Sequence, residues 1–257
     1  MESNVFNTRE FDDRSALVTG AATGNGEAIA RRLFAGRAKV ALVGHNVTAL
    51  RAIAQELDGT GERALAIEVD VRNEAAMREA VRQTADRFGG LHLAVNNAGT
   101  PGPANTPIEA LALAEWDDVI GTSLTGVFLS LKVELPTMMA SGGGAIVNLS
   151  SANGIVGIAG LAAYTAAKHG VVGLTRSVAL EYADKNIRVN CIGPGYVATP
   201  RIMEAPPEVR DAMAAAHPIT RLATREDVAE LTAFLLSDRA AFCTGGFYPV
   251  DGGYTAR

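Results

Sequence analysis

A tyrosine and a lysine four residues apart, Tyr164 and Lys168, are the residues of this chain best suited to proton transfer. They lie in an Ala-, Val- and Leu-rich stretch, 162–180, that predicts a helix, and residues four apart share one face of a helix. Because a positive charge favours phenolate, we expect Lys168 to lower the pKa of Tyr164 toward neutral pH. Such a tyrosine is a general acid/base for a carbonyl or an alcohol. Ser151, thirteen residues earlier at the end of a strand-like run, 144–151, can hold the same substrate oxygen.

A glycine-rich turn joins the first predicted strand, 16–19, to the first predicted helix, 24–35, which is the context that a nucleotide-binding loop requires. Gly20 permits a tight turn, and Gly24 and Gly26 let the backbone approach a pyrophosphate. The helix N-terminus adds N–H donors and the positive end of a dipole. The turn reads Thr19-Gly20-Ala21-Ala22-Thr23-Gly24-Asn25-Gly26.

The Ser151, Tyr164 and Lys168 spacing resembles the active-site signature of the short-chain dehydrogenase/reductase family, and the glycine turn resembles its T-G-x-x-x-G-x-G loop. The resemblance runs from about Ser15 to Gly253. It implies a Rossmann-like NAD(P)-dependent oxidoreductase in which Tyr164 is the acid/base, Lys168 also holds the nicotinamide ribose, and Ser151 orients the carbonyl. It further implies these cofactor contacts: Gly20, Thr23, Gly24, Asn25 and Gly26 in the loop; Asp70 and Val71 at the adenine; Asn97, Ala98 and Gly99 under the adenosine ribose; Pro194, Gly195, Val197 and Thr199 at the nicotinamide carboxamide.

Two residues depart from the family pattern. Ser123 stands where the family has a fourth catalytic residue, an Asn thought to bend its helix and to hold a proton-relay water. A serine hydroxyl donates and accepts but is shorter, so we expect Ser123 to serve the relay only in part. Asn25 stands where the family usually has an aliphatic residue, and we expect it to alter contacts near the phosphates or the nicotinamide without abolishing the loop.

The end of the second predicted strand bears on the choice between NAD and NADP. NAD-dependent dinucleotide folds usually place Asp or Glu there to bind the ribose 2′-hydroxyl, whereas this chain reads Val43-Gly44-His45-Asn46. The missing carboxylate removes a repulsion against a 2′-phosphate, and His45 can donate to that phosphate. The alternative is that His45 is a solvated turn residue. The sequence therefore favours NADP and leaves NAD open.

Strand and helix patterns alternate along the chain, which predicts a single α/β domain with a doubly wound parallel sheet of about seven strands and helices on both faces. We expect residues 14–257 to form this domain and residues 1–13 to be a frayed N-terminal extension. The irregular, proline-rich stretch 196–220 is the predicted substrate loop, with Ile202, Met203, Met213 and His217 in the pocket. The predicted strands are 16–19, 40–43, 64–69, 93–95, 144–151, 187–192 and 247–250. The predicted helices are 24–35, 47–57, 74–88, 108 or 116 to 131, 162–180, 208–215 and one capped by Thr224.

Composition narrows the range of partners. The chain has 257 residues, 48% hydrophobic and 20% charged, so a sizeable core is expected and disorder is not. The net charge of −5 argues against nucleic acid, and the lack of an eighteen-residue apolar run predicts no membrane span. Cys191 and Cys243 predict neither a metal site nor a disulfide framework. We expect a cytoplasmic protein, and the family resemblance implies a homo-oligomer, either a tetramer or a dimer.

These features together predict an NAD(P)-dependent oxidoreductase that interconverts a small-molecule secondary alcohol and a ketone. The alternative is a catalytically weak or inactive dinucleotide-binding sensor on the same fold, because fold alone does not establish function. Ser151, Tyr164 and Lys168 together favour the enzyme, whereas Ser123 and Asn25 keep the sensor open. The sequence leaves open the substrate, for which sugars, polyols, acyl thioesters and cyclic ketones are all compatible, and the direction of the reaction.

Overall fold

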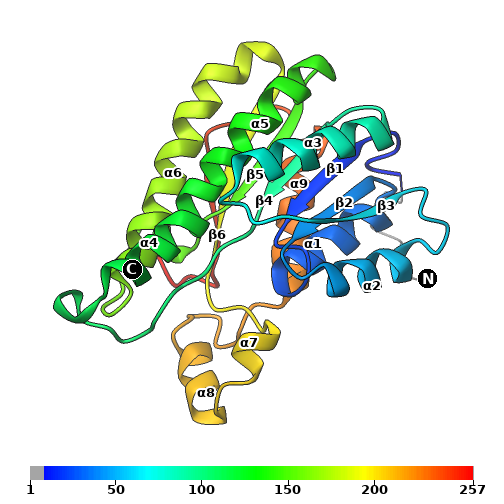
Figure 1. Ribbon diagram of the computed structural model, residues 1–257. Helices are drawn as coiled ribbons and strands as arrows, with labels where there is room; N and C mark the ends of the chain where they lie inside the picture. Colours follow the sequence, from blue (N-terminus) through cyan, green and yellow to red (C-terminus); the bar gives the residue numbers. More distant parts are fainter. Residues whose placement is uncertain (1–8, 257) are drawn as a thin grey trace.

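Seven parallel strands form one sheet in the order β3-β2-β1-β4-β5-β6-β7 in the computed structural model, which describes residues 9–256 (Figure 1). Most strand residues are buried, as apolar strands covered on both faces must be. This arrangement confirms the predicted doubly wound α/β fold. The strands are β1 (Ser15–Thr19), β2 (Lys39–Gly44), β3 (Ala64–Glu68), β4 (Leu93–Asn96), β5 (Gly144–Leu149), β6 (Ile187–Pro194) and β7 (Phe247–Val250).

Helices cover both faces of the sheet, and a separate apolar core fills each side (Figure 1). One face carries α1 (Gly24–Ala35), α2 (Val47–Leu57) and α9 (Arg225–Leu236). The other carries α3 (Glu74–Phe88), α5 (Gly126–Ala140) and α6 (Ala162–Tyr182). The strand order reverses between β1 and β4, so their carboxyl ends open a crevice of the kind that binds ligands in such folds.

The helix before β5 is longer and less regular than predicted. A 3₁₀ turn (Ile108–Ala110) precedes α4 (Leu113–Ile120), a π-helical turn (Gly121–Thr125) follows, and α5 continues to Ala140. The expected end at residue 131 is wrong, since the helix stops only where Gly142 and Gly143 adopt positive φ. Within residues 9–256, the run Leu113–Ala140 is the one helical stretch with the length and composition of a membrane span. More than half of its most apolar window is buried inside the domain, as in a core helix.

The N-terminal segment differs from the expected frayed extension wherever the structure describes it. Phe11 is 1% exposed, its N–H donates to the Gly36 carbonyl at 2.8 Å, and its ring contacts the α-carbon side of Gly36. The Glu10 carboxylate bridges Arg32 and Arg239 at 2.7 and 2.6 Å. Burial of an aromatic ring and a two-arginine ion pair therefore fix this part, while the rest of the predicted extension, 1–8, lies outside the described residues.

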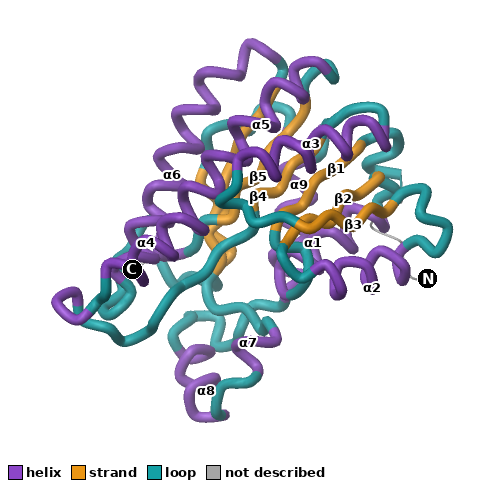
Figure 2. Tube along the Cα trace, viewed as in Figure 1, coloured by secondary structure: helices purple, strands orange, loops and turns teal. Residues whose placement is uncertain are grey.

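Two short helices occupy the predicted substrate loop at the carboxyl edge of the sheet (Figure 1). They are α7 (Pro200–Met203), which the sequence did not reveal, and α8 (Pro207–Ala215), one residue longer than expected. Each begins with a proline at its first position, where the missing N–H costs no helical hydrogen bond. Figure 2 shows that loops join both helices to the body of the domain, so this segment is attached to the domain at its two ends.

A carboxyl group is buried within the core on the α5 side of the sheet. Glu134 is fully buried, and its Oε2 accepts a hydrogen bond from Asn96 Nδ2 at 3.1 Å. The same Nδ2 donates to Asn148 Oδ1, and Asn148 Nδ2 donates to Thr175 Oγ1, at 3.0 and 2.9 Å. Burial raises the pKa of Glu134 to about 7. This network joins β4 and β5 to α5 and α6. Glu134 Oε1 is buried without a hydrogen-bond partner, so a protonated, neutral carboxyl suits this site better than a charged one.

Replacing Glu134 by glutamine is expected to remove a pH-dependent loss of stability. Because the folded-state pKa is raised, the stabilisation is fully present below the ordinary pKa of 4.5 and disappears as the pH rises through about 7. The predicted loss is about 3 kcal/mol of unfolding free energy. Urea unfolding at pH 5 and pH 8 measures it, with the exposed Glu109→Gln as control. Equal slopes of stability against pH in wild type and Glu134→Gln would show that the carboxyl does not titrate as described.

Candidate active site

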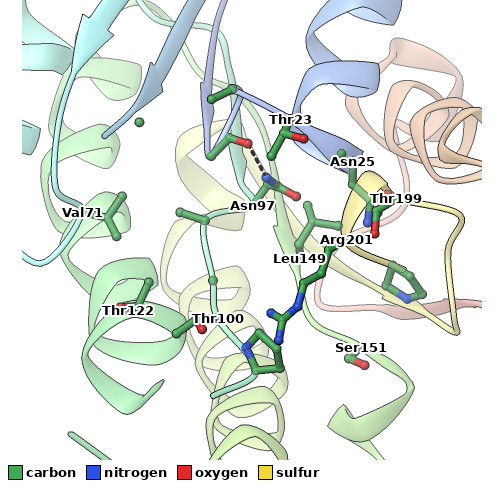
Figure 3. Close-up of a pocket in the computed structure, with 18 of the residues that line it drawn as sticks. Thr23, Asn25, Val71, Asn97, Thr100, Thr122, Leu149, Ser151, Thr199 and Arg201 are labelled. Carbon is green, nitrogen blue, oxygen red and sulfur yellow. Dashed lines mark hydrogen bonds between the residues drawn. The ribbon is translucent and has the colours of Figure 1, made fainter. Parts of the chain in front are cut away.

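A cavity of about 760 Å³ opens at the carboxyl ends of the strands, spanning the point where the strand order reverses (Figure 3). Its volume is in the range of small-molecule sites. The structure brings together nearly all the residues predicted for catalysis and cofactor binding, and only Gly26 and Ser123 lie behind the wall. The predicted residues that line it are Gly20, Thr23, Gly24, Asn25, Gly44, His45, Asp70, Val71, Asn97, Ala98, Gly99, Ser151, Tyr164, Lys168, Pro194, Gly195, Val197 and Thr199.

The glycine loop has no room for a side chain at Gly20 or at Gly26. Gly20 and Gly24 adopt left-handed φ values of 64° and 60°. A Cβ at Gly26 would lie 2.2 Å from the Gly20 carbonyl oxygen and 2.5 Å from Asn97 Nδ2. That amide donates to the Thr19 and Gly20 carbonyls at 3.0 and 3.1 Å, so the end of β4 braces the loop after β1. The cradle of bare backbone at the start of α1 fits a dinucleotide pyrophosphate.

Lys168 and Tyr164 lie side by side on α6, and Ser151 faces them from the end of β5. Lys168 is 3% exposed, and its Nζ donates to the Leu149 carbonyl at 2.6 Å. Nζ lies 5.5 Å from the centre of the Tyr164 ring. Ser151 Oγ accepts from the Asn153 backbone N–H at 3.2 Å, which fixes the hydroxyl at the cavity wall. The cavity wall at this end therefore carries two hydroxyls and one ammonium.

Desolvation controls the proton affinities of this pair. Burial raises the pKa of Tyr164, while a hydrogen bond with Ser151 and the positive charge of Arg201 act against it. Burial also lowers the pKa of Lys168 to about 8. The predicted lowering of the Tyr164 pKa is wrong for this structure, because loss of water is the largest effect and raises it, while the Lys168 ammonium is directed to the Leu149 carbonyl. The phenol thus keeps its proton at neutral pH.

Ser123 lies in the π-helical turn, and its hydroxyl makes two hydrogen bonds to the backbone of one loop. Its Oγ accepts from the Thr100 N–H at 3.0 Å and donates to the Thr100 carbonyl at 2.9 Å. A Cβ built on Gly99 would sit 3.2 Å from this oxygen and 3.4 Å from Lys168 Nζ, so Gly99 lies between them. Ser123 therefore fixes the segment after β4 that borders Lys168, which makes it a positioning residue in this structure.

The end of the cavity predicted to hold the adenosine also contains two residues that were not predicted from the sequence, Arg72 and Asp118. Arg72 binds the Asp70 carboxylate at 2.7 Å and Asp118 at 3.0 Å. Gly44 and His45 line the wall, and Asn46 caps α2 by accepting from the Ala49 N–H at 3.1 Å. Gly44 has space for a Cβ, since the nearest atom would be Leu50 Cδ1 at 3.8 Å.

The substrate loop contributes different residues from those predicted. Ile202 lines the cavity, but Met203, Met213 and His217 do not. His217 is 2% exposed, its Nε2 accepts from the Tyr196 N–H at 3.0 Å, and it would meet a Cβ at Gly195 at 2.5 Å, so it supports the turn after β6. Arg201 lines the cavity instead. Arg201 follows Pro200 in a stretch without helical periodicity, so no sequence pattern indicated that its side chain would line the cavity.

Comparisons with known proteins agree with the site. Residues 20–255 match a family model described as enoyl-(acyl carrier protein) reductase. A cyclohexanol dehydrogenase of Acinetobacter sp. (strain SE19) is 43% identical over 250 residues, covering 97% of this chain and 98% of the relative. A cis-4-hydroxycyclohexanecarboxylate dehydrogenase of Sinomonas cyclohexanicum is 46% identical over 246 residues, covering 96% and 98%. The crystal structure of a 3-ketoacyl-(acyl-carrier-protein) reductase from Brucella melitensis complexed with NADH aligns with a TM-score of 0.88 at 32% identity, covering 95% and 99%.

This chain belongs to the short-chain dehydrogenase/reductase family. It is an oxidoreductase that acts on CH–OH donors, as its relatives are, and the family binds NAD(P). The predicted family membership and enzyme class are thereby confirmed.

Gly26→Ala is expected to abolish cofactor binding, because the added methyl group overlaps the Gly20 carbonyl and Asn97. We predict at least a hundredfold weaker NAD(P)H binding, measured by the fluorescence of the bound nicotinamide, because the backbone that forms the cradle must shift to make room for the methyl group. Gly173→Ala is the matched control, because nothing lies within 4 Å of a Cβ there. If Gly26→Ala bound the cofactor as the control does, the cradle would not be the phosphate site.

Proposed function

We propose that this chain interconverts a cyclic secondary alcohol and its ketone with NAD(P), using Tyr164 as the general acid/base. The observation that carries the proposal is that Tyr164, Lys168 and Ser151 line the same cavity as the glycine cradle. Two relatives above 40% identity across nearly the whole chain are named for alcohols on a cyclohexane ring, which supports a ring substrate.

The chain's own residues suit the cofactor in this cavity. The Gly20–Gly26 loop would hold the pyrophosphate, Asp70 and Val71 would face the adenine, and Pro194 to Thr199 would face the nicotinamide. When bound, the nicotinamide supplies hydride to a ketone or accepts it from an alcohol.

Tyr164 would donate its proton to the carbonyl oxygen as that oxygen gains negative charge. Its raised pKa keeps the proton on the phenol until the substrate oxygen becomes the stronger base. Lys168, protonated below about pH 8, stabilises the phenolate left behind, and the Ser151 hydroxyl holds the same substrate oxygen. Because Lys168 is buried, its charge acts through a medium that screens it far less than water does.

Tyr164→Phe tests this role, since it keeps the ring and removes the acid. We expect kcat for reduction of cyclohexanone to fall by about 10²–10⁴-fold, with NAD(P)H affinity near that of wild type. Tyr182→Phe, on the same helix but away from the cavity, is the control. A loss below tenfold would remove Tyr164 from the mechanism. Bound cofactor with no turnover of any alcohol or ketone in the wild type would favour the sensor instead.

The proposed cofactor is NADP in preference to NAD. The wall at the end of β2 offers Gly44 and His45 where an acidic residue would repel a 2′-phosphate. The nearby Asp70 carboxylate is bound by Arg72, which partly neutralises it. The absence of a carboxylate at Gly44 and the pairing of the Asp70 carboxylate both reduce repulsion of the 2′-phosphate of NADP.

Gly44→Asp should shift the preference toward NAD. The space around Gly44 accepts the Cβ, and a carboxylate about 4 Å from a phosphate lowers the NADP/NAD ratio of kcat/KM by about tenfold or more. Gly44→Ala separates the effect of the added bulk from that of the charge. A wild type that strongly prefers NAD, or a ratio unchanged in Gly44→Asp, would refute the preference.

We also propose that the protein is a cytoplasmic homo-oligomer. Phe128 on α5 and Leu180 on α6 are 47% and 85% exposed, and such apolar side chains on the two long helices support pairing between subunits.

A further inference from the structure

Arg201 is a cation in the cavity wall to which the structure assigns no partner. Every other charged side chain that lines the cavity has one: Arg72 binds Asp70 and Asp118, and Lys168 binds the Leu149 carbonyl. Within residues 9–256, no hydrogen bond or ion pair engages the Arg201 guanidinium, although Glu204 lies on the next turn of the chain. On the same segment Arg221 is paired with Asp227, whereas Arg210 Nε is buried without a hydrogen-bond partner. Arg201 is exposed and lines the cavity, and an open arginine fork in such a wall is suited to a planar anion of the ligand.

The direction of the side chain places this cation on the substrate side of the cavity. Thr199, at the start of α7, lies 3.4 Å from a Cβ built on Gly24, so the backbone here borders the phosphate cradle. Figure 3, however, shows the Arg201 side chain extending away from Thr23 and Asn25 of the glycine loop, with its guanidinium on the side of Thr100 and Ser151. The charge of Arg201 is also felt at Tyr164, where it acts to lower the pKa. The guanidinium thus faces the acid/base end of the cavity.

We infer that Arg201 binds a carboxylate of the substrate, so that the natural substrate is a cyclic hydroxy acid or oxo acid. This inference rests on the proposed function of the same site. The substrate oxygen lies at Tyr164 and Ser151, and Leu149, Pro101 and Ile202 supply apolar wall for a hydrocarbon body between the two polar ends. A charge-assisted contact at one end and the acid/base at the other fix which carbon faces the hydride site.

The test compares 4-oxocyclohexanecarboxylate with its neutral carboxamide, which has nearly the same shape. The readout is the ratio of kcat/KM for the acid to that for the amide in wild type, Arg201→Gln and Arg201→Lys. A change at Tyr164 caused by loss of the nearby charge affects both substrates alike, so it cancels in the ratio. Arg210→Gln, which makes the same charge change on the same segment outside the cavity wall, is the control.

Wild type should prefer the acid, and Arg201→Gln should lower the acid/amide ratio by about ten- to a hundredfold. Arg201→Lys should recover part of the ratio, because it keeps the charge but loses the planar fork. Arg210→Gln should leave the ratio at the wild-type value. A ratio near one in wild type that Arg201→Gln does not change would overturn the inference while leaving the proposed function standing.

Two further outcomes are informative. One distinguishes a cofactor phosphate from a substrate carboxylate, and the other distinguishes failure of the proposed function from failure of the inference. If Arg201→Gln weakened NADP and NAD binding and left the ratio unchanged, the guanidinium would hold cofactor phosphates and the inference would be overturned. If neither substrate were turned over, the proposed function would fail, and calorimetry of cyclohexanecarboxylate binding would still decide the role of Arg201. Tighter binding of cyclohexanecarboxylate than of its amide, lost in Arg201→Gln, would support the inference, and equal binding would overturn it.

Discussion

The burial of Lys168 beside Tyr164 is the interaction on which the site depends. An ammonium at 3% exposure is stable in the core only because it donates to the Leu149 carbonyl, which ends β5 at the edge of the sheet. That contact sets the distance between helix α6 and strand β5 and so places Tyr164 opposite Ser151. The same loss of water that raises the pKa of the phenol lowers that of the lysine to about 8. One buried group, the Lys168 ammonium, therefore affects both proton transfer and the packing of α6 on the sheet.

The loops around this pair are fixed by neutral hydrogen bonds to the backbone. Asn97 ties the end of β4 to the carbonyls of Thr19 and Gly20, and Ser123 ties the following residues to the π-helical turn through Thr100. Both side chains use a single polar group to hold two backbone groups. The cofactor cradle thus follows the strand ends and the acid/base lies on α6, which packs on the sheet, whereas α7, which carries Arg201, and α8 are joined to the body by loops (Figure 2).

Much of this architecture follows from the sequence, because strands buried on both faces and amphipathic helices leave strong periodic patterns. The helices 24–35, 47–57 and 74–88 have the bounds predicted from the sequence. Features that depend on distant partners were not predictable. A Cβ at Gly36 would overlap the Phe11 ring, and Arg201 lines the cavity only because the fold brings α7 beside it. The direction of the Tyr164 pKa shift was also missed, since spacing on a helix shows the neighbouring charge but not the removal of water.

The most direct test of this account is the pH dependence of ketone reduction. The kcat/KM for a neutral cyclic ketone, measured from pH 6 to pH 10 under saturating reduced cofactor, reports the proton that the buried pair must hold. The account predicts a level rate at low pH that falls above about pH 8, where Lys168 loses its proton and the phenolate loses its counter-charge. A rate that rises with pH, or that stays level to pH 10, would contradict it.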